Sequence, residues 1–96
     1  MNESANLSDV RREIDTIDHD LIELLARRQG LVEEAGRLKQ GHPHDAVKAP
    51  DRVAQVIASR RSDAESAGLD PDVAEHVWRA MIDAFIELEM RVHAQG

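Results

Sequence analysis

Residues 7–40 read LSDVRREIDTIDHDLIELLARRQGLVEEAGRLKQ, and this stretch decides the fold. Its apolar side chains recur at steps of three and four residues, as on one face of an α-helix: Leu7, Val10, Ile14, Ile17, Leu21, Leu24, Leu31, Ala35 and Leu38. Arg28 occupies one step of this apolar stripe. A guanidinium keeps its proton, so burying it is costly unless an anion from the protein or from a ligand neutralises it. Arg28 is therefore the first candidate for a ligand-binding residue.

Two further cations border the same stripe, Arg11 near its start and Lys39 at its end. Three cations along one apolar face are suited to hold an anion. The alternative is structural: Arg11 and Lys39 extend to solvent, and Arg28 pairs with a carboxylate on another helix.

The length of this helix predicts the assembly. The caps at residues 6–8 and the stop at Gly41-His42-Pro43 delimit a helix over about residues 7–40, after a flexible segment at residues 1–6. Such a helix is roughly 50 Å long, whereas a compact domain of this size has a radius of gyration near ~13 Å. We therefore expect an intertwined homodimer in which two long helices cover each other.

Two more helices are expected after a polar loop at residues 41–49. Pro50 suits the first turn of a helix over residues 50–67, and Gly68 suits its end. Asp70 and Pro71 are the clearest start signal in the chain and open a helix over residues 71–94. The predicted fold class is all-α, with a three-helix protomer and a long N-terminal helix.

Each of these helices has an apolar stripe of its own. The stripe of the second helix is Val53, Val56, Ile57 and Arg60. The stripe of the third is Val77 or Trp78, Met81 or Ile82, then Phe85, Glu89 and Val92. Glu89 is thus an ionisable residue in an apolar row, as Arg28 is in the first helix.

Composition narrows the function classes. With 96 residues the chain is expected to form one domain, and its net charge of −7 with one Trp, one Phe and no Tyr argues against nucleic acid binding. There is no cysteine, no apolar run that could cross a bilayer and no hydrophobic leader, so we expect a soluble cytoplasmic protein without a membrane partner.

The chain offers little for metal or nucleophilic chemistry. His42, His44 and Asp45 resemble metal ligands, but they lie in a loop without a fourth partner, and we predict no metal. Ser59 and Ser62 have no evident base nearby. The chemistry left to the cations and Glu89 is electrostatic: they can hold a small polyanion in one conformation and stabilise charge as it develops.

Three segments carry a family resemblance: residues 10–18 (VRREIDTID), 24–28 (LLARR) and 36–39 (GRLK). They resemble the all-helical chorismate mutases, over a region from about Leu7 to Met90. The resemblance implies an intertwined homodimer of three-helix protomers with two equivalent active sites, each completed by an arginine of the other subunit. It also implies conversion of chorismate to prephenate by a pericyclic rearrangement without a cofactor. No activating partner enzyme is identified from the sequence.

By position, the resemblance implies a role for each candidate residue. Arg11 resembles the arginine donated across the dimer to a substrate carboxylate, and Arg28 the carboxylate clamp of the main subunit. Lys39 resembles the donor to the ether oxygen whose bond to carbon breaks, and Glu89 its second partner. These roles suit forked guanidinium donors and an ammonium, and Glu89 can donate only when it is protonated. The remaining substrate-binding candidates are Arg52, which resembles a further active-site arginine, and Phe85.

The chain departs from typical chorismate mutases at two positions. Ala49 and Val53 stand where those enzymes carry acidic residues that contact the C4 hydroxyl of the substrate. The run Ala49-Pro50-Asp51-Arg52-Val53 is similar to the isochorismate pyruvate lyases, which form salicylate and pyruvate from a substrate without that hydroxyl. Glu89 instead matches the mutases, including the 4-amino-4-deoxychorismate mutases, which combine a similar Pro-x-Arg-Val segment with a Glu.

Three hypotheses follow. The first is a chorismate mutase-type isomerase acting on chorismate or 4-amino-4-deoxychorismate, which Glu89 favours. The second is an isochorismate pyruvate lyase. The third, of a different class, is a non-catalytic helical dimer or binding module whose cations only make ion pairs. One observation argues against this third hypothesis. Glu89 is the one carboxyl plainly in the same apolar layer as four cations, and one carboxylate cannot neutralise all four: Arg11, Arg28, Lys39 and Arg52.

Overall fold

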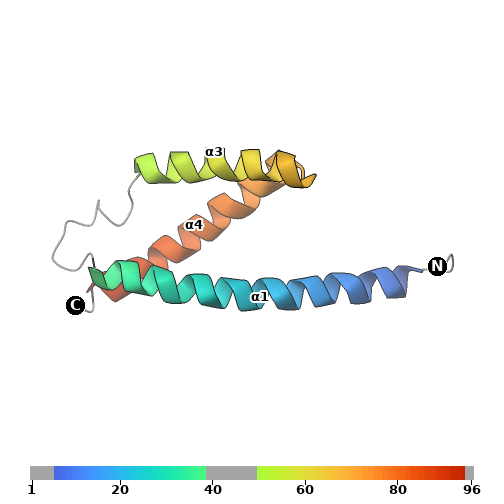
Figure 1. Cartoon of the computed structure of the whole chain (residues 1–96). Helices are drawn as coiled ribbons and strands as arrows, with labels where there is room; N and C mark the ends of the chain where they lie inside the picture. The colour runs from blue at the N-terminus through green and yellow to red at the C-terminus, as the bar shows by residue number, and fades with distance from the viewer. Residues whose placement is uncertain (1–5, 39–49, 95–96) are drawn as a thin grey trace. The chain divides into compact units, whose positions relative to one another are not determined.

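The computed structural model describes residues 6–38 and 50–94, and the regular structure of these residues is entirely helical. The helices are α1 (Leu7–Leu38), α3 (Pro50–Ala67) and α4 (Pro71–Ala94) (Figure 1). Over residues 6–38 and 50–94, the predicted all-α class with three helices is confirmed. The chain forms two compact units, Met1–Leu31 and Val32–Gly96, so α1 begins in the first and ends in the second.

The start of α1 follows from its capping residue. The side-chain oxygen Oδ1 of Asn6 accepts a hydrogen bond of 3.0 Å from the backbone N–H of Asp9, and the backbone N–H of Val10 donates to the carbonyl of Asn6 over 3.0 Å. Asp9 also complements the positive end of the helix dipole.

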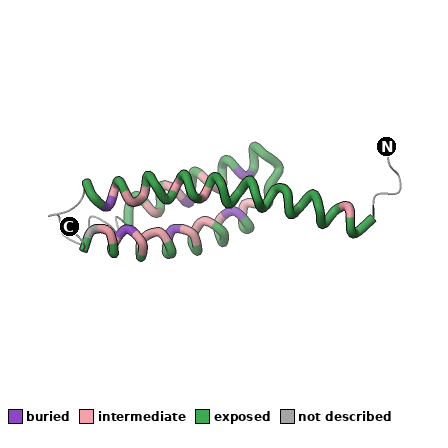
Figure 2. Tube along the Cα trace, turned by 90° about the horizontal axis from the view of Figure 1, so that it is seen from below, coloured by how far each residue is buried: buried purple, intermediate pink, exposed green. Residues whose placement is uncertain are grey.

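Much of the apolar stripe of α1 is exposed in the single chain. Ile17 is 57% exposed, Leu21 is 50% exposed, and most of the helix before Leu31 is coloured as exposed in Figure 2. A contiguous row of large apolar side chains in water is unusual for a monomer, because such surfaces are commonly interaction sites.

The turn between α3 and α4 is fixed by backbone conformation at one glycine. Gly68 has a φ of 82°, in the left-handed region that lacks a steric penalty only for glycine. Its N–H donates to the carbonyl of Glu65 over 3.3 Å, and the N–H of Leu69 donates to the carbonyl of Ala64 over 2.8 Å. This pair of bonds satisfies the last carbonyls of α3. Asp70 then caps α4, its Oδ1 accepting from the N–H of Asp72 over 2.8 Å.

The hairpin of α3 and α4 holds most of the buried apolar residues among those described, with α3 packed against α4. These are Ile57, Ala64, Ala74 and Ile82. Ala64 and Ala74 are small, which permits a close approach of the two helices near the turn.

Of the alternatives on the third helix, Ile82 is buried and Met81 half-buried, while Trp78 is half-buried and Val77 is 47% exposed. The core-facing stripe of α4 therefore runs through Trp78 and Ile82.

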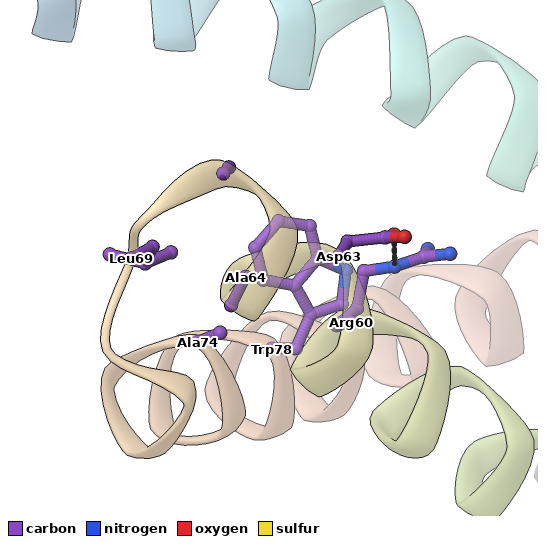
Figure 3. Close-up of a pocket in the computed structure, with 7 residues that line it drawn as sticks. Arg60, Asp63, Ala64, Leu69, Ala74 and Trp78 are labelled. Carbon is purple, nitrogen blue, oxygen red and sulfur yellow. Dashed lines mark hydrogen bonds and ion pairs between the residues drawn. The ribbon is translucent and has the colours of Figure 1, made fainter.

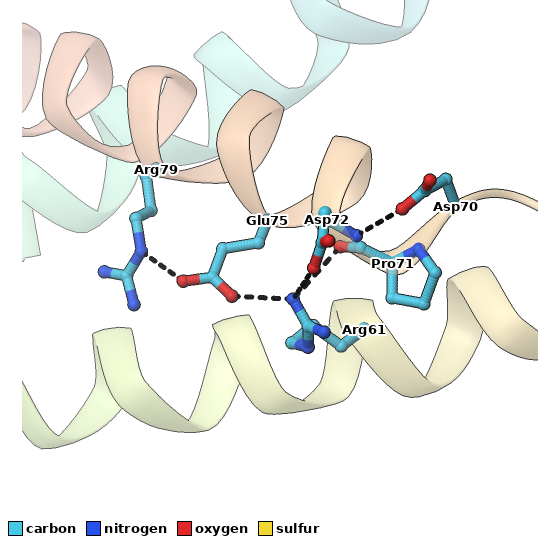
Figure 4. A network of polar contacts seen from close by, with 6 residues as sticks. All are labelled: Arg61, Asp70, Pro71, Asp72, Glu75 and Arg79. Carbon is cyan, nitrogen blue, oxygen red and sulfur yellow. Dashed lines mark hydrogen bonds and ion pairs between the residues drawn. The ribbon is translucent and has the colours of Figure 1, made fainter.

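A network of charged side chains crosses from α3 to α4 beside this core (Figure 4). Nη1 of Arg61 on α3 contacts Oε1 of Glu75 at 2.8 Å and Oδ1 of Asp72 at 3.1 Å, both on α4. Nε of Arg79 contacts the second oxygen of Glu75, Oε2, at 2.7 Å. The network joins the two helices close to their turn.

Candidate active site

The first unit carries two of the predicted substrate-binding cations, both on α1. Arg11 is exposed. Arg28 is half-buried, and its guanidinium nitrogen Nη1 is shielded from solvent. The partial burial of Arg28 fits its place in an apolar stripe.

Arg11 and Arg28 cannot serve one small ligand from the same chain. They are 17 residues apart in one continuous helix, and at ~1.5 Å per residue this separates their Cα atoms by roughly 25 Å along the axis. A site that uses both arginines needs them from two copies of the chain.

Glu89 is a buried charged residue in the second unit. Its side chain lies in α4, and the residue is 8% exposed, in the same range as the apolar core residue Ile82. Phe85, which is half-buried, precedes it by one helical turn on the same face of α4. The prediction that Glu89 shares the apolar row of its helix is confirmed by its burial.

The C-terminal turns of α1 approach α4 closely at Glu89. Gly36 is buried, and a Cβ placed on it would lie 3.1 Å from the carbonyl oxygen of Glu89 and 3.2 Å from its Cγ. The same Cβ would lie 3.2 Å from the Cβ of Val92. The absence of a side chain at Gly36 therefore permits the observed distance between the two helices. Gly36, near the described end of α1, therefore lies beside Glu89.

Arg52 and Val53 lie in the first turn of α3, in the same unit as Glu89. Arg52 is exposed, and Val53 is half-buried. The half-buried Val53 continues into the buried side of its helix through Val56 and Ile57, as the predicted stripe requires.

The remaining predicted site residues, Lys39 and Ala49, lie outside the described residues. So does the cluster of His42, His44 and Asp45. Within residues 6–38 and 50–94, no group of three or more His, Cys, Asp or Glu side chains is arranged to hold a metal ion. None of the helices in these two ranges combines the length and the apolar character needed to span a membrane.

The turn end of the hairpin contains a hollow of about 370 Å³, lined by Trp78, Ala64, Ala67, Leu69, Ala74, Arg60 and Asp63 (Figure 3). Nε of Arg60 contacts Oδ2 of Asp63 at 3.0 Å on its rim. Among the described residues, none of the predicted site residues lines it. Trp78 is 11 residues from Glu89 along α4, which corresponds to roughly 16 Å, so the hollow and Glu89 are separate features of the hairpin.

Gly36 is the residue near the candidate site that sequence reasoning missed. In the sequence it stands out only as the first residue of the GRLK segment. The helical period does not reveal it, because the predicted stripe passes through Ala35 and Leu38 and not through Gly36. Its burial follows from the close approach of α4.

These features define an all-helical protein with cations on one long helix and a buried carboxyl on another. The chain belongs to the chorismate mutase type II family, whose model matches residues 10–90. The resemblance seen in the sequence is thereby confirmed.

Known relatives carry two different names. The chain is 41% identical over 80 residues to a T-protein of Enterobacter agglomerans, and 41% identical over 73 residues to a T-protein of Haemophilus influenzae. These matches cover 81% and 76% of the chain but only 21% and 19% of the T-proteins, so the chain spans about a fifth of their length. It is also 34% identical over 91 residues to an isochorismate pyruvate lyase of Pseudomonas aeruginosa, covering 95% of the chain and 88% of the lyase.

Proposed function

We propose that this protein is a chorismate mutase-type enzyme that catalyses a cofactor-free pericyclic rearrangement of chorismate or 4-amino-4-deoxychorismate. The product is prephenate or its amino analogue. In this reaction one carbon–oxygen bond of the ether bridge breaks while one carbon–carbon bond forms, and no atom is gained or lost. Such a reaction needs no nucleophile and no metal, only a site that holds the reactive conformation and stabilises developing charge.

The observation that carries the proposal is the burial of Glu89 beside the last turns of α1. Negative charge grows on the ether oxygen as its bond to carbon breaks. A protonated Glu89 donates a hydrogen bond to that oxygen, and Lys39 supplies a second donor. A donor held in place before the reaction stabilises the transition state more than the ground state.

The cations bind the carboxylates of the substrate. Arg28, with part of its guanidinium shielded from solvent, clamps one carboxylate through paired N–H donors. Arg52 contributes at the start of α3, and Phe85 and Val53 provide apolar walls. We further propose that Ala49 belongs to the wall facing C4 of the ring.

We propose that the site is shared within a homodimer. The roughly 25 Å between Arg11 and Arg28 along α1 supports this assignment, because Arg11 can then reach only the site of a second copy. The exposed stripe of α1 supports it as well, since two such stripes would cover each other.

A second candidate function is isochorismate pyruvate lyase. The full-length similarity to the Pseudomonas aeruginosa lyase favours it, as does the apolar Val53 where mutases carry an acidic residue. The same cations would then hold isochorismate while pyruvate is eliminated and salicylate forms.

The decisive experiment incubates the pure protein separately with chorismate, isochorismate and 4-amino-4-deoxychorismate and identifies the products. We expect prephenate or its amino analogue, formed at a rate well above the uncatalysed reaction. Salicylate and pyruvate from isochorismate as the dominant products would establish the lyase instead. No turnover of any of the three would leave the non-catalytic binding module as the function.

A further inference from the structure

Gly36 occupies a helical position that does not require glycine for its backbone conformation. It lies inside α1, two residues before the last residue of the described helix, where alanine would favour the helix more. What distinguishes Gly36 is its surroundings: an added Cβ would meet three atoms of α4 at 3.1–3.2 Å, whereas ordinary van der Waals contacts lie at 3.4–4 Å. The close approach of α4 is therefore the feature that glycine accommodates at position 36.

Two of those three atoms belong to Glu89. One is its backbone carbonyl oxygen, at 3.1 Å, and the other is its Cγ, at 3.2 Å. Cγ is bonded directly to the carboxyl carbon, so displacing Cγ displaces the carboxyl group. Displacing the carbonyl oxygen instead moves the backbone from which the side chain extends. Either response to a methyl group at position 36 moves the Glu89 carboxyl by a few tenths of an ångström.

We propose that Gly36 is a positioning residue for the reaction, and that its missing side chain sets the place of the Glu89 carboxyl relative to the end of α1. This inference rests on the proposed function, in which Glu89 donates to the breaking bond. Gly36 touches no reacting atom and acts through Glu89. Because transition-state hydrogen bonds depend steeply on geometry, a displacement below 1 Å is enough to reduce turnover.

The same helix provides a matched control. Gly30 lies six residues before Gly36 in α1, and no heavy atom lies within 4 Å of a Cβ placed on it. Gly30→Ala and Gly36→Ala make the same chemical change in the same helix. They differ in what the new methyl group meets.

The first test compares the steady-state kinetics of the two variants with those of the wild type. Gly36→Ala should lower kcat by about tenfold or more, with KM changed by less than about threefold, because substrate carboxylates are still bound by the arginines. Gly30→Ala should leave both constants unchanged. Equal kcat for Gly36→Ala and the wild type would overturn the proposal.

A double-mutant cycle separates positioning from general loosening of the fold. In a Glu89→Ala background the carboxyl is absent, so adding Gly36→Ala should change kcat by less than about twofold. If Gly36→Ala still lowers kcat by tenfold there, the glycine acts through something other than Glu89, and the proposal is wrong.

A further variant covers failure of Gly36→Ala to fold. The third close atom is the Cβ of Val92, which lies two residues before the end of α4, so that a glycine there affects only the end of the helix. In Gly36→Ala/Val92→Gly the contact with the Cβ of Val92 is removed, and the two contacts with Glu89 remain. We expect this double variant to fold, by circular dichroism, and to keep the reduced kcat, measured against Val92→Gly alone. Full recovery of kcat would show that only packing against Val92 mattered.

Crystal structures of the wild type and Gly36→Ala test the geometry without any substrate. A Glu89 carboxyl shifted relative to the end of α1 supports the positioning role, and an unmoved carboxyl excludes it. If the wild type turns over none of the three candidate substrates, the proposed function has failed, whereas these structures still decide whether Gly36 places Glu89.

Discussion

Arg61 on α3 donates a hydrogen bond of 2.8 Å from Nη1 to Oε1 of Glu75 on α4. The other carboxylate oxygen of Glu75 accepts a hydrogen bond of 2.7 Å from Nε of Arg79. The pKa of Glu75 lies below its ordinary value of 4.5, mainly because of the hydrogen bond from Arg79. Desolvation of the carboxyl raises this pKa, and the hydrogen bond from Arg61 lowers it further. The hydrogen bond to Asp72, with a further contribution from Glu75, raises the pKa of Arg61. This network ties the two helices of the hairpin together.

Glu75→Gln should therefore make the free energy of unfolding depend less on pH in the acidic range. A carboxyl with a lowered folded-state pKa stabilises the protein above its unfolded pKa, and this stabilisation is lost as pH falls through the folded-state value. The wild type should unfold at a higher urea concentration than Glu75→Gln at pH 7, and the difference should shrink below about pH 4.5. Urea unfolding at several pH values measures it.

Asp63→Asn is the control for that experiment. Asp63 pairs with Arg60 at 3.0 Å, and both residues lie within α3. Its removal should change stability less than Glu75→Gln, because exposed pairs within one helix contribute little. Equal losses of stability in the two variants would mean that the ion pair of Glu75 between α3 and α4 stabilises the protein no more than a pair within one helix.

The apolar stripe of α1 leads to a prediction about assembly. Ile17 is 57% exposed in the single chain, and in the proposed dimer it is covered by a second copy. Ile17→Asn should weaken the dimer and lower turnover, while Asp20→Asn, on an exposed polar position of α1, should not. The midpoint of unfolding should rise with protein concentration for the wild type. Sedimentation that reveals a fully folded monomer at low micromolar concentration would refute the dimer.

The fold was largely predictable because its signals are local. Asn6 and Asp70 cap the helices in which they were expected, and Gly68 adopts the left-handed conformation expected after the second helix. The burial of individual side chains was harder to predict from the sequence. The choice between Val77 and Trp78 depends on the angle at which α3 crosses α4, and the small residues Ala64 and Ala74 set that crossing.

The candidate site was predictable only in part, for a physical reason. Arg28 and Glu89 attract attention because each is a charge in an apolar row, and their partial or nearly complete burial follows from that pattern. Gly36 carries no charge and breaks no pattern. Its importance arises from a contact between segments more than fifty residues apart in sequence, a relationship that helical periodicity does not encode.

Arg28→Ala should lower kcat/KM by about a hundredfold or more, because it removes a preorganised charge contact to a substrate carboxylate. The protein should stay folded, since the variant also removes a partly buried charge. The neighbouring Arg27 is exposed, and Arg27→Ala should retain most of the activity. Loss of folded structure in Arg28→Ala, seen by circular dichroism, would instead support a purely structural ion pair.

Val53→Glu should change substrate preference. Val53 stands where typical mutases carry an acidic residue that contacts the C4 hydroxyl, and a carboxylate near the N-terminus of α3 is favoured by the helix dipole. We expect kcat/KM for chorismate to rise about tenfold relative to isochorismate, in line with one added hydrogen bond. Gln55→Glu places the same charge on an exposed position of α3 and should leave the ratio unchanged. An unchanged ratio in Val53→Glu would separate this residue from the C4 wall.

Glu89→Gln isolates the role of the proton on the buried carboxyl. Only a protonated Glu89 can donate to the ether oxygen, whereas the amide of glutamine donates at every pH. Glu89→Gln should therefore keep the fold and retain kcat, whereas Glu89→Ala, which has no donor at this position, should lower kcat by about a hundredfold. Glu87 lies on the exposed side of α4, so Glu87→Ala serves as the control and should retain the wild-type kcat. If Glu89→Ala keeps the kcat of the wild type, the carboxyl donates no hydrogen bond to the reaction, and the preference for a mutase over a lyase loses its main support.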